Sequence, residues 1–284
     1  MESSTPIEPI DYLVIGHLTQ DLTPQGPVLG GTAAYAALTA RNIGLRVGII
    51  TSFGPEASVG ILKGIQMVSL PTEKSTTFKN LITPAGRKQY VLNIAPSINI
   101  RQVPELWRHT PIVHLGPIAQ EVEPNLVRYF PDSFIGVTPQ GWLRDWDKEG
   151  RVFPGEWPEA SFVLQRASAA VLSIEDIQGN EDRIEEMASS IRTLVVTEGA
   201  AGARVYWNGD LRHFNPPAVE EIDGTGAGDI FAAAFFIRFN ITHDAWESAQ
   251  FATFLAANSV TRPGLQGVPT PQDVGAYIVE ELQN

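Results

Sequence analysis

The sequence predicts an α/β protein with a doubly wound, mostly parallel sheet. Short apolar, β-rich segments alternate with segments of helical periodicity along most of the chain, which favours parallel strands covered by helices on both faces. A glycine-rich turn bounded by Asp223 and Asp229 leads directly into an apolar helical segment. Ligands of open α/β sheets bind beyond the carboxyl ends of the strands. We therefore expect Asp229, at the start of a late helix, to lie at that rim.

The expected strands are short apolar runs of β-forming residues. They cover residues 13–15, 47–51, 112–115, 134–137, 169–172 and 194–196. The expected helices have a helical pattern of apolar residues and cover 32–43, 125–130, 181–190, 230–239 and 245–260. No internal repeat, low-complexity tract or linker divides the chain. Its length suits one large domain, so we expect residues 1–284 to form a single α/β domain.

Residues 66–95 interrupt this alternation. Residues 76–82 and 87–92 are rich in β-forming residues, and the turn between them contains Pro84 and Gly86. This pattern indicates a β-hairpin. Such a hairpin could cover a ligand or pack on the core as an edge hairpin.

The segment Asp223-Gly224-Thr225-Gly226-Ala227-Gly228-Asp229 carries the most informative chemistry. Its glycines can adopt backbone angles that a Cβ disfavours, so several N–H groups can converge at the N-terminus of the next helix. An anion is stabilised at such a place. Asp229 could accept the proton of a hydroxyl that attacks a phosphate held there, which indicates phosphoryl transfer. The alternative is an ordinary helix start with an acidic first turn.

The same segment resembles the C-terminal signature of the ribokinase-like (PfkB) carbohydrate kinases. Residues 11–16 are similar to that family's first strand, Gly30 and Gly31 to the diglycine before its first helix, and residues 194–202 to a segment that lines the nucleotide site. The resemblance covers roughly residues 10–275. It implies a kinase that uses ATP and Mg²⁺, with a monovalent cation as a further candidate, to phosphorylate an alcohol of a small polyhydroxylated molecule. It also implies a small β-lid, from about residues 17–30 and 66–95, that closes over the substrate and can form a homodimer contact.

The resemblance assigns a candidate role to individual residues. Asp229 is the expected general base, and the amides of Gly226, Ala227 and Gly228 form the expected anion hole. The candidate substrate-binding residues are Asp21, Gly30, Gly31 and Tyr35. The candidate nucleotide-binding residues are Thr197, Gly199, Gly202, Thr225 and Asn258, and the candidate metal ligands are Glu175 and Asp176. A carboxylate such as Asp21 can accept two hydroxyl hydrogen bonds, which suits a vicinal diol; a solvated loop acid is its alternative.

Two positions differ from the family's pattern. Tyr35 stands where many members carry an asparagine that contacts the sugar, and a phenol cannot reproduce the donor and acceptor of an amide. Ser173 and Asp176 stand where many members carry Asn-x-x-Glu near the phosphates, and Glu175 could substitute. Sugars, inositols and nucleosides therefore stay open as substrates. A ligand-binding or regulatory protein that kept the fold and lost catalysis is the alternative function, which Asp229 opposes.

Three side chains outside this set are also of interest. Arg144 follows a predicted strand and could bind phosphate or form an ion pair with Asp145 or Asp147. His17 lies beside the expected substrate loop, and His114, within an apolar strand, is expected in the core.

Composition argues against several other functions. The net charge of −12 argues against nucleic-acid binding, and the absence of cysteine excludes disulfides and thiolate chemistry. The histidines lack metal-ligand spacing, and neither a dinucleotide-binding Gly-x-Gly-x-x-Gly segment nor a P-loop is present. The longest apolar run, 230–237, is far shorter than the ~20 residues of a membrane span, and the N-terminus lacks signal-peptide features. We expect a cytoplasmic protein.

Overall fold

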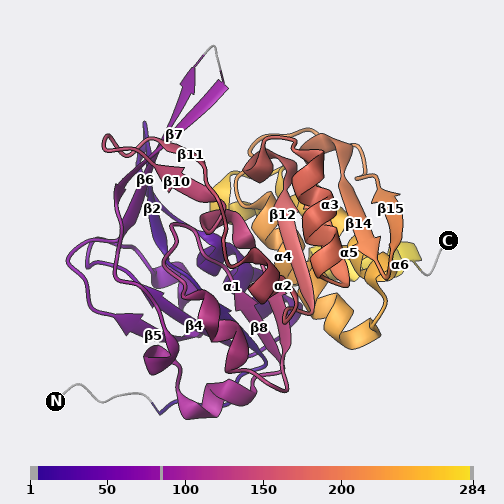
Figure 1. Cartoon of the computed structure of the whole chain (residues 1–284), viewed down its shortest axis with the longest axis horizontal. Helices are drawn as coiled ribbons and strands as arrows, with labels where there is room; N and C mark the ends of the chain where they lie inside the picture. Colours follow the sequence, from indigo (N-terminus) through magenta and orange to yellow (C-terminus); the bar gives the residue numbers. More distant parts are fainter. Residues whose placement is uncertain (1–5, 84–85, 282–284) are drawn as a thin grey trace.

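The computed structural model describes residues 6–83 and 86–281, and within them nine strands form one sheet through the centre of the molecule (Figure 1). The strands are β1 (Tyr12–Ile15), β4 (Val47–Ser52), β5 (Gln66–Leu70), β8 (Ile112–Leu115), β9 (Phe134–Val137), β12 (Ala169–Ser173), β13 (Thr193–Thr197), β14 (Ala203–Trp207) and β15 (Asp210–Phe214). Their order is β15-β14-β13-β12-β9-β8-β1-β4-β5. Neighbours from β5 to β13 are parallel, and only β14 and β15 at one edge are antiparallel. The predicted, mostly parallel sheet is confirmed.

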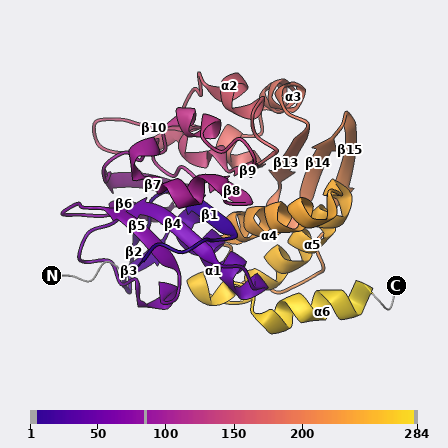
Figure 2. The same cartoon turned by 90° about the horizontal axis from the view of Figure 1, so that it is seen from below.

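Helices cover both faces of this sheet (Figure 2). One face packs against α1 (Thr32–Ile43), α4 (Ala227–Thr242) and α5 (Ala245–Ser259), and α6 (Pro271–Glu281) packs against α1 and α5. The other face packs against α2 (Ala160–Leu164), α3 (Glu181–Ser190) and several 3-10 helices. Of the eight 3-10 helices in the described residues, Gly60–Leu62 and Gly264–Gly267 contribute Leu62 and Leu265 to the first face. The others are Ile100–Gln102, Glu105–His109, Pro124–Arg128, Pro139–Gly141, Ile174–Ile177 and Gly199–Ala201. The sheet is therefore doubly wound, as predicted.

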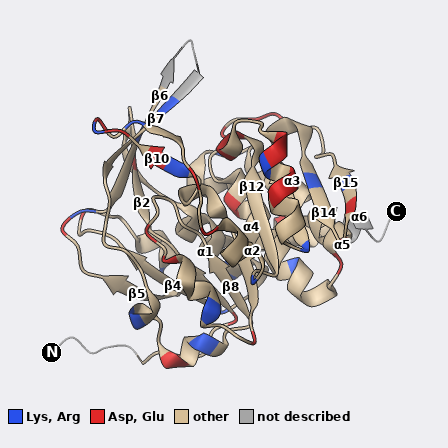
Figure 3. Cartoon of the chain, in the orientation of Figure 1, with Lys and Arg blue, Asp and Glu red and all other residues tan. Residues whose placement is uncertain are grey.

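The strands in the middle of the sheet explain why both faces are covered. β1, β4, β8, β9 and β12 contain no charged residue, and charged side chains lie mainly outside them (Figure 3). Successive side chains of a strand point to opposite faces. Tyr12 and Val14 accordingly enter the core beneath α1 and α4, whereas Leu13 and Ile15 enter the opposite core.

One expected helix is wrong. Residues 125–130 do not form an α-helix; the 3-10 helix Pro124–Arg128 lies there instead. Pro131 disfavours the helical conformation at the residue before it, so the segment ends after little more than one turn. Its apolar pattern still reflects burial, because Leu126 and Val127 pack into the core. The other four expected helices form.

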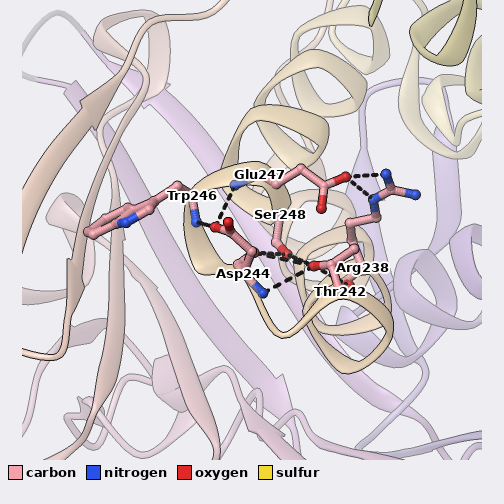
Figure 4. A network of polar contacts seen from close by, with 6 residues as sticks. All are labelled: Arg238, Thr242, Asp244, Trp246, Glu247 and Ser248. Atoms are coloured by element: carbon pink, nitrogen blue, oxygen red, sulfur yellow. Dashed lines mark hydrogen bonds and ion pairs between the residues drawn. The ribbon is translucent and has the colours of Figure 1, made fainter.

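The turn between α4 and α5 fixes the helix that begins at the glycine-rich loop (Figure 4). The Asp244 carboxylate accepts hydrogen bonds from the backbone N–H groups of Trp246 (2.8 Å) and Glu247 (3.2 Å), and so caps α5. Arg238 of α4 forms an ion pair with Glu247 of α5. These contacts hold the two helices together at the end of α4 that is remote from the loop.

A second sheet of four strands stands beside the first one. Its strands are β2 (Thr19–Thr23), β3 (Gly26–Gly30), β6 (Thr76–Thr83) and β7 (Gly86–Asn93), in the order β3-β2-β6-β7. β6 and β7 are the predicted hairpin, whose turn residues 84–85 lie outside the described residues. A two-stranded ribbon, β10 (Arg144–Trp146) and β11 (Val152–Pro154), joins β7 through the hydrogen bond from Val91 N–H to the Gly150 carbonyl (2.8 Å).

The expected boundary of the second lid segment is partly wrong. Gln66–Leu70 forms β5 and pairs with β4 at the edge of the main sheet. The segment that belongs to the second sheet begins at Thr76, where β6 pairs with β2. The apolar residues of β5 pack on the main core, which the position of this segment next to a hairpin did not reveal.

The helices were compared with the length and the apolar character of a membrane span. In the described part of the chain, none combines the length and the apolar character needed to cross a bilayer.

Candidate active site

The glycine-rich loop and the start of α4 form the centre of the site. Gly226 is the N-cap of α4 and has a φ of 81°, in the left-handed region that favours glycine. The Asp223 carboxylate accepts hydrogen bonds from Thr225 N–H (2.9 Å) and from Gly264 N–H (2.8 Å). Asp223 therefore organises the loop and ties it to the segment after α5.

The amides at this helix start are not equivalent. Ala227 N–H donates to the Gly224 carbonyl at 3.2 Å, so it contributes to the turn itself. The first N–H groups of a helix have no partner within the helix, so the amides of Gly226 and Gly228 are the candidate donors of the expected anion hole. An anion placed here would also meet the positive end of the α4 dipole.

Asp229 lies in the first turn of α4 with part of its surface open to solvent. Thr32 Oγ1 donates a hydrogen bond of 2.6 Å to Asp229 Oδ1. Burial raises the pKa of Asp229 to about 6, against the lowering effects of the Thr32 hydrogen bond and the Arg144 charge. The charges of Asp176 and Asp21 raise this pKa further. A carboxylate that titrates near neutral pH is well suited to accept a proton.

The structure therefore brings together charged residues that are far apart in the sequence. Asp21 lies on β2, Arg144 on β10, Asp176 on a 3-10 helix after β12, and Asp229 on α4. The charges of Asp21, Arg144 and Asp176 all act on the carboxylate of Asp229, so the four residues lie around one site. Arg144 also donates to the Ile118 carbonyl (3.3 Å) and lies over the Phe78 ring of β6, 5.8 Å from its centroid. The site thus extends from the main sheet to the second sheet.

The diglycine brings Asp21 to the start of α1. A Cβ at Gly30 would lie 2.3 Å from Asp21 Oδ2, so a larger residue here would displace this carboxylate from its present position. A Cβ at Gly31 would lie 2.6 Å from the His17 carbonyl oxygen. Thr19 Oγ1 donates a long hydrogen bond of 3.4 Å to Asp21 Oδ1. The Asp21 carboxylate is held beside the first turn of α1, on the side of the second sheet.

Tyr35 lies beneath the glycine-rich loop. Its side chain is buried, and a Cβ at Gly226 would lie 2.2–2.6 Å from three atoms of its ring. Burial raises the pKa of the Tyr35 phenol, and the charges of Asp229, Asp21 and Asp223 raise it further. The position that resembles a sugar-binding amide thus holds a ring packed against Gly226.

The candidate nucleotide-binding residues lie on three segments, of which the structure joins two. Thr197 ends β13, and the turn from Gly199 to Gly202 is closed by the hydrogen bond from Glu198 N–H to the Gly202 carbonyl (2.7 Å). Thr225 lies in the glycine-rich loop, and Asn258 lies near the end of α5. The loop and the end of α5 are joined, because the N–H groups at 222 and 223 donate to the Val260 carbonyl.

The candidate metal ligands are only partly suited to that role. Asp176 accepts hydrogen bonds from Gln140 Nε2 (3.0 Å) and from Ser173 N–H (2.9 Å), which makes it a capping residue of the 3-10 helix Ile174–Ile177. Glu175 is exposed. Within residues 6–83 and 86–281, no cluster of three acidic or histidine side chains could hold a metal ion. The oxygen atoms of Asp176 and Glu175 therefore suit a Mg²⁺ ion that is bound mainly by phosphates and water, with few protein ligands.

Several residues near the site were not predicted as members of it. Thr32 gave no signal except its place after the diglycine. Glu121 is buried and accepts hydrogen bonds from His17 N–H (2.9 Å), Ile118 N–H (2.9 Å) and Ala119 N–H (2.7 Å). The sequence around Glu121, which contains Gln120 and Glu123, gave no sign of this role. Glu121 fixes the loop after β8 to the end of β1.

The two histidines have structural contacts. His17 is buried, and its ring nitrogens contact Thr76 Oγ1 (2.7 Å) and the Pro96 carbonyl (3.0 Å), which anchors the start of β6. His114 contacts the Tyr12 hydroxyl (2.7 Å) and Thr138 Oγ1 (2.9 Å), and burial lowers its pKa to about 3. The expectation of a satisfied core residue at His114 is confirmed.

Comparisons with known proteins agree with this geometry. The sequence model of the pfkB family carbohydrate kinases matches residues 154–273, which contain the glycine-rich loop and Asp229. The Escherichia coli fructokinase is 24% identical over 261 residues, which cover 81% of this chain and 84% of that enzyme.

Solved structures show the same fold. A pyrophosphate-dependent kinase of the ribokinase family, complexed with a pyrophosphate analog and myo-inositol, superposes with a TM-score of 0.79 at 19% identity, over 93% of this chain and 99% of that one. The Arabidopsis thaliana ribokinase complexed with ribose and ATP superposes with a TM-score of 0.72 at 14% identity, over 95% and 98%. The fold and the matched segment agree: this chain is similar to the ribokinase-like pfkB carbohydrate kinases, a family of phosphotransferases whose sequence model covers residues 154–273.

Proposed function

We propose that this protein transfers the γ-phosphoryl group of ATP to an alcohol of a small polyhydroxylated substrate, a sugar, an inositol or a nucleoside. The observation that carries the proposal is the position of Asp229, a carboxylate with a pKa of about 6 in the first turn of α4. It adjoins glycine amides that can hold a phosphate, so base and anion hole share one helix start.

Asp229 acts as the general base in this proposal. In its ionised form it accepts the proton of the substrate hydroxyl as the oxygen of that hydroxyl attacks phosphorus. The amides of Gly226 and Gly228, together with that of Ala227 if its turn relaxes, stabilise the charge on the transferring phosphoryl group.

Asp21 binds the substrate hydroxyls beside the start of α1. Gly30 and Gly31 let the chain approach closely enough for this, and Tyr35 closes the floor between the substrate and the loop. The second sheet acts as a lid over the substrate, and its exposed edge is the proposed homodimer contact. A sedimentation experiment that finds only monomers at working concentration would remove the dimer.

In this proposal the phosphoryl donor and the cations lie on the side of Gly226 that is opposite the substrate. Thr197, Gly199, Gly202, Thr225 and Asn258 would line the nucleotide, and Asp176, with Glu175 as a weaker candidate, would hold the Mg²⁺ that accompanies its phosphates. A bound Mg²⁺ supplies charge neutralisation for the phosphates. A monovalent cation is a further candidate near Asp223.

The test is a screen for consumption of ATP with Mg²⁺ over sugars, sugar phosphates, inositols and nucleosides. Inorganic pyrophosphate is tested as a second donor, because one similar structure holds its analog. Asp229→Asn should lower kcat with the best substrate roughly 10²–10⁴-fold, the usual contribution of a positioned base. Asp182→Asn, an exposed acid in the first turn of α3, is the matched control and should leave kcat unchanged.

Each outcome decides between named alternatives. Substantial turnover by Asp229→Asn would show that the base is assigned wrongly. No turnover on the whole panel, with ATP still raising the melting temperature, would favour a binding protein that lost catalysis. If neither donor supports turnover or raises the melting temperature, the proposal that this protein is a kinase is contradicted.

The substrate clamp is tested separately. Asp21→Ala should raise the substrate KM or lower kcat by about tenfold or more, because hydrogen bonds to a charged group are lost. The KM for the donor should change little. Unchanged substrate KM and kcat would remove Asp21 from the site.

A further inference from the structure

The first turn of α1 contacts both parts of the proposed transfer site. Thr32 and Tyr35 are three residues apart, so they lie on the same side of the helix. Their side chains are 1% and 3% exposed. Thr32 contacts Asp229, and Tyr35 contacts Gly226. One helical turn therefore touches both the carboxylate and the loop that begins α4.

Packing leaves Thr32 little freedom. A Cβ at Gly116 would lie 2.7 Å from Thr32 Cγ2 and 3.2 Å from its Cβ, so the methyl side is filled by backbone of the loop after β8. The hydroxyl is thereby directed at Asp229 Oδ1, at 2.6 Å. A β-branched side chain has few rotamers even without such contacts. Thr32 thus holds one oxygen of the carboxylate and leaves the other for a substrate hydroxyl.

Tyr35 constrains the loop in a different way. Its ring fills the space next to the Cα of Gly226, the residue with a φ of 81°. Burial of a phenol ring against backbone contributes dispersion and apolar contact that does not depend on the hydroxyl. Thr39 of the same helix donates to the Tyr35 carbonyl (2.8 Å), which supports the turn from within.

We propose that Thr32 and Tyr35 are positioning residues: the first turn of α1 sets the orientation of Asp229 and the conformation of Gly226 together. The inference rests on the proposed function for its kinetic consequence. It goes beyond that function because neither residue needs to contact the substrate or the donor. It also changes the role expected for Tyr35, from a substrate ligand to a support of the anion hole.

The kinetic test uses Thr32→Val, which keeps the shape and removes the hydroxyl, and Thr32→Ser, which keeps the hydroxyl. Thr32→Val should lower kcat about tenfold, the effect of one hydrogen bond to a charged group, with little change in donor KM. The acid limb of the pH profile of kcat/KM should shift to higher pH by about one unit, because the hydrogen bond from Thr32 stabilises the ionised form of Asp229 and this variant lacks it. Thr32→Ser should keep most of the wild-type kcat and most of the wild-type position of the acid limb.

The matched control is Thr39→Val. It removes a buried threonine hydroxyl from the same helix, but that hydroxyl bonds to a backbone carbonyl. It should lower the melting temperature like Thr32→Val and leave the pH profile unchanged. Equal pH profiles for wild type and Thr32→Val would overturn the role of Thr32.

A second readout does not depend on activity. The Asp229 carboxyl is titrated by ¹³C NMR in wild type, Thr32→Val and Thr32→Ser, and its resonance is assigned by its loss in Asp229→Asn. The groups that also act on this carboxylate are Asp21, Asp176, Arg144, Tyr12 and Tyr35. They are the same in all three proteins, so a rise in the pKa confined to Thr32→Val supports the inference. If it rises while no substrate turns over, the positioning stands and the proposed function fails.

Tyr35 is tested by ring removal. Tyr35→Phe keeps the ring and should retain kcat within a few-fold. Tyr35→Leu leaves space beside Gly226 and should lower kcat at least tenfold with a smaller change in substrate KM. A large rise in substrate KM in Tyr35→Phe, without loss of kcat, would instead identify the phenol as a substrate ligand and overturn this part.

Discussion

The two faces of the nine-stranded sheet differ in how regular their covering is. The face toward α1, α4 and α5 is covered by helices of 12, 16 and 15 residues. The opposite face is covered by the five-residue α2, the ten-residue α3 and short 3-10 helices, with large residues such as Trp107 and Phe130 between them. Both faces bury the central strands β1, β4, β8 and β12 almost completely, so regularity is not needed for burial.

The difference lies in what each face positions. The two helices whose N-termini meet at the site, α1 and α4, both belong to the regular face. A long helix packed along its length fixes the direction of its first N–H groups and of its first-turn side chains. The irregular face contributes mainly stability, and its contribution to the site passes through loops such as the one that carries Asp176. Changes on the two faces should therefore affect different measurements.

The largest effect is expected at Gly226. Gly226→Ala places a Cβ against the Tyr35 ring at a φ that disfavours alanine, so the anion hole should shift. We expect kcat to fall about a hundredfold or more, as when one anion-hole donor is lost, and the melting temperature to fall. Gly44→Ala is the matched control, because Gly44 also has a positive φ (107°) but caps the far end of α1, where its Cβ would have nothing within 4 Å. Equal kinetics for the two variants would contradict the proposed anion hole.

The next effect separates the two faces. Trp107 is fully buried on the irregular face, and its Nε1 donates to the Glu8 carbonyl (3.0 Å). Trp107→Ala should lower the free energy of unfolding by about 3–5 kcal/mol, as measured by urea denaturation. The kcat of the protein that stays folded at low temperature should change less than twofold. A large loss of kcat at unchanged stability would show that this face also positions the site.

The smallest effect concerns pH. Because the pKa of Asp229 is raised to about 6 and the base must be ionised, kcat/KM should fall roughly tenfold per unit as pH decreases below about 6. Activity should level off above that value until another group titrates. The profile is measured with saturating donor and low substrate. An acid limb near the ordinary aspartate pKa of about 4 would mean that burial does not control this carboxylate.

Local pattern was enough for much of the fold and for the centre of the site. The apolar runs identified the strands of the central sheet because those strands are buried on both faces. The edge strands β5, β14 and β15 and the ribbon of β10 and β11 were not identified, because a half-exposed strand lacks a continuous apolar run. The Asp223–Asp229 segment could be recognised as a candidate site from the sequence because its turn, its helix start and its acids are contiguous.

The chemistry of Asp229 and its glycines, the alternation of strands and helices, and the family resemblance all followed from residues that are neighbours in the chain. The contacts of Thr32 with Asp229, of Tyr35 with Gly226 and of Glu121 with three backbone amides join residues that are distant in sequence. Only the packing of α1 against α4 and of the loops around β1 and β8 creates them. The raised pKa of Asp229 has the same origin, because burial and the surrounding charges exist only in the folded chain.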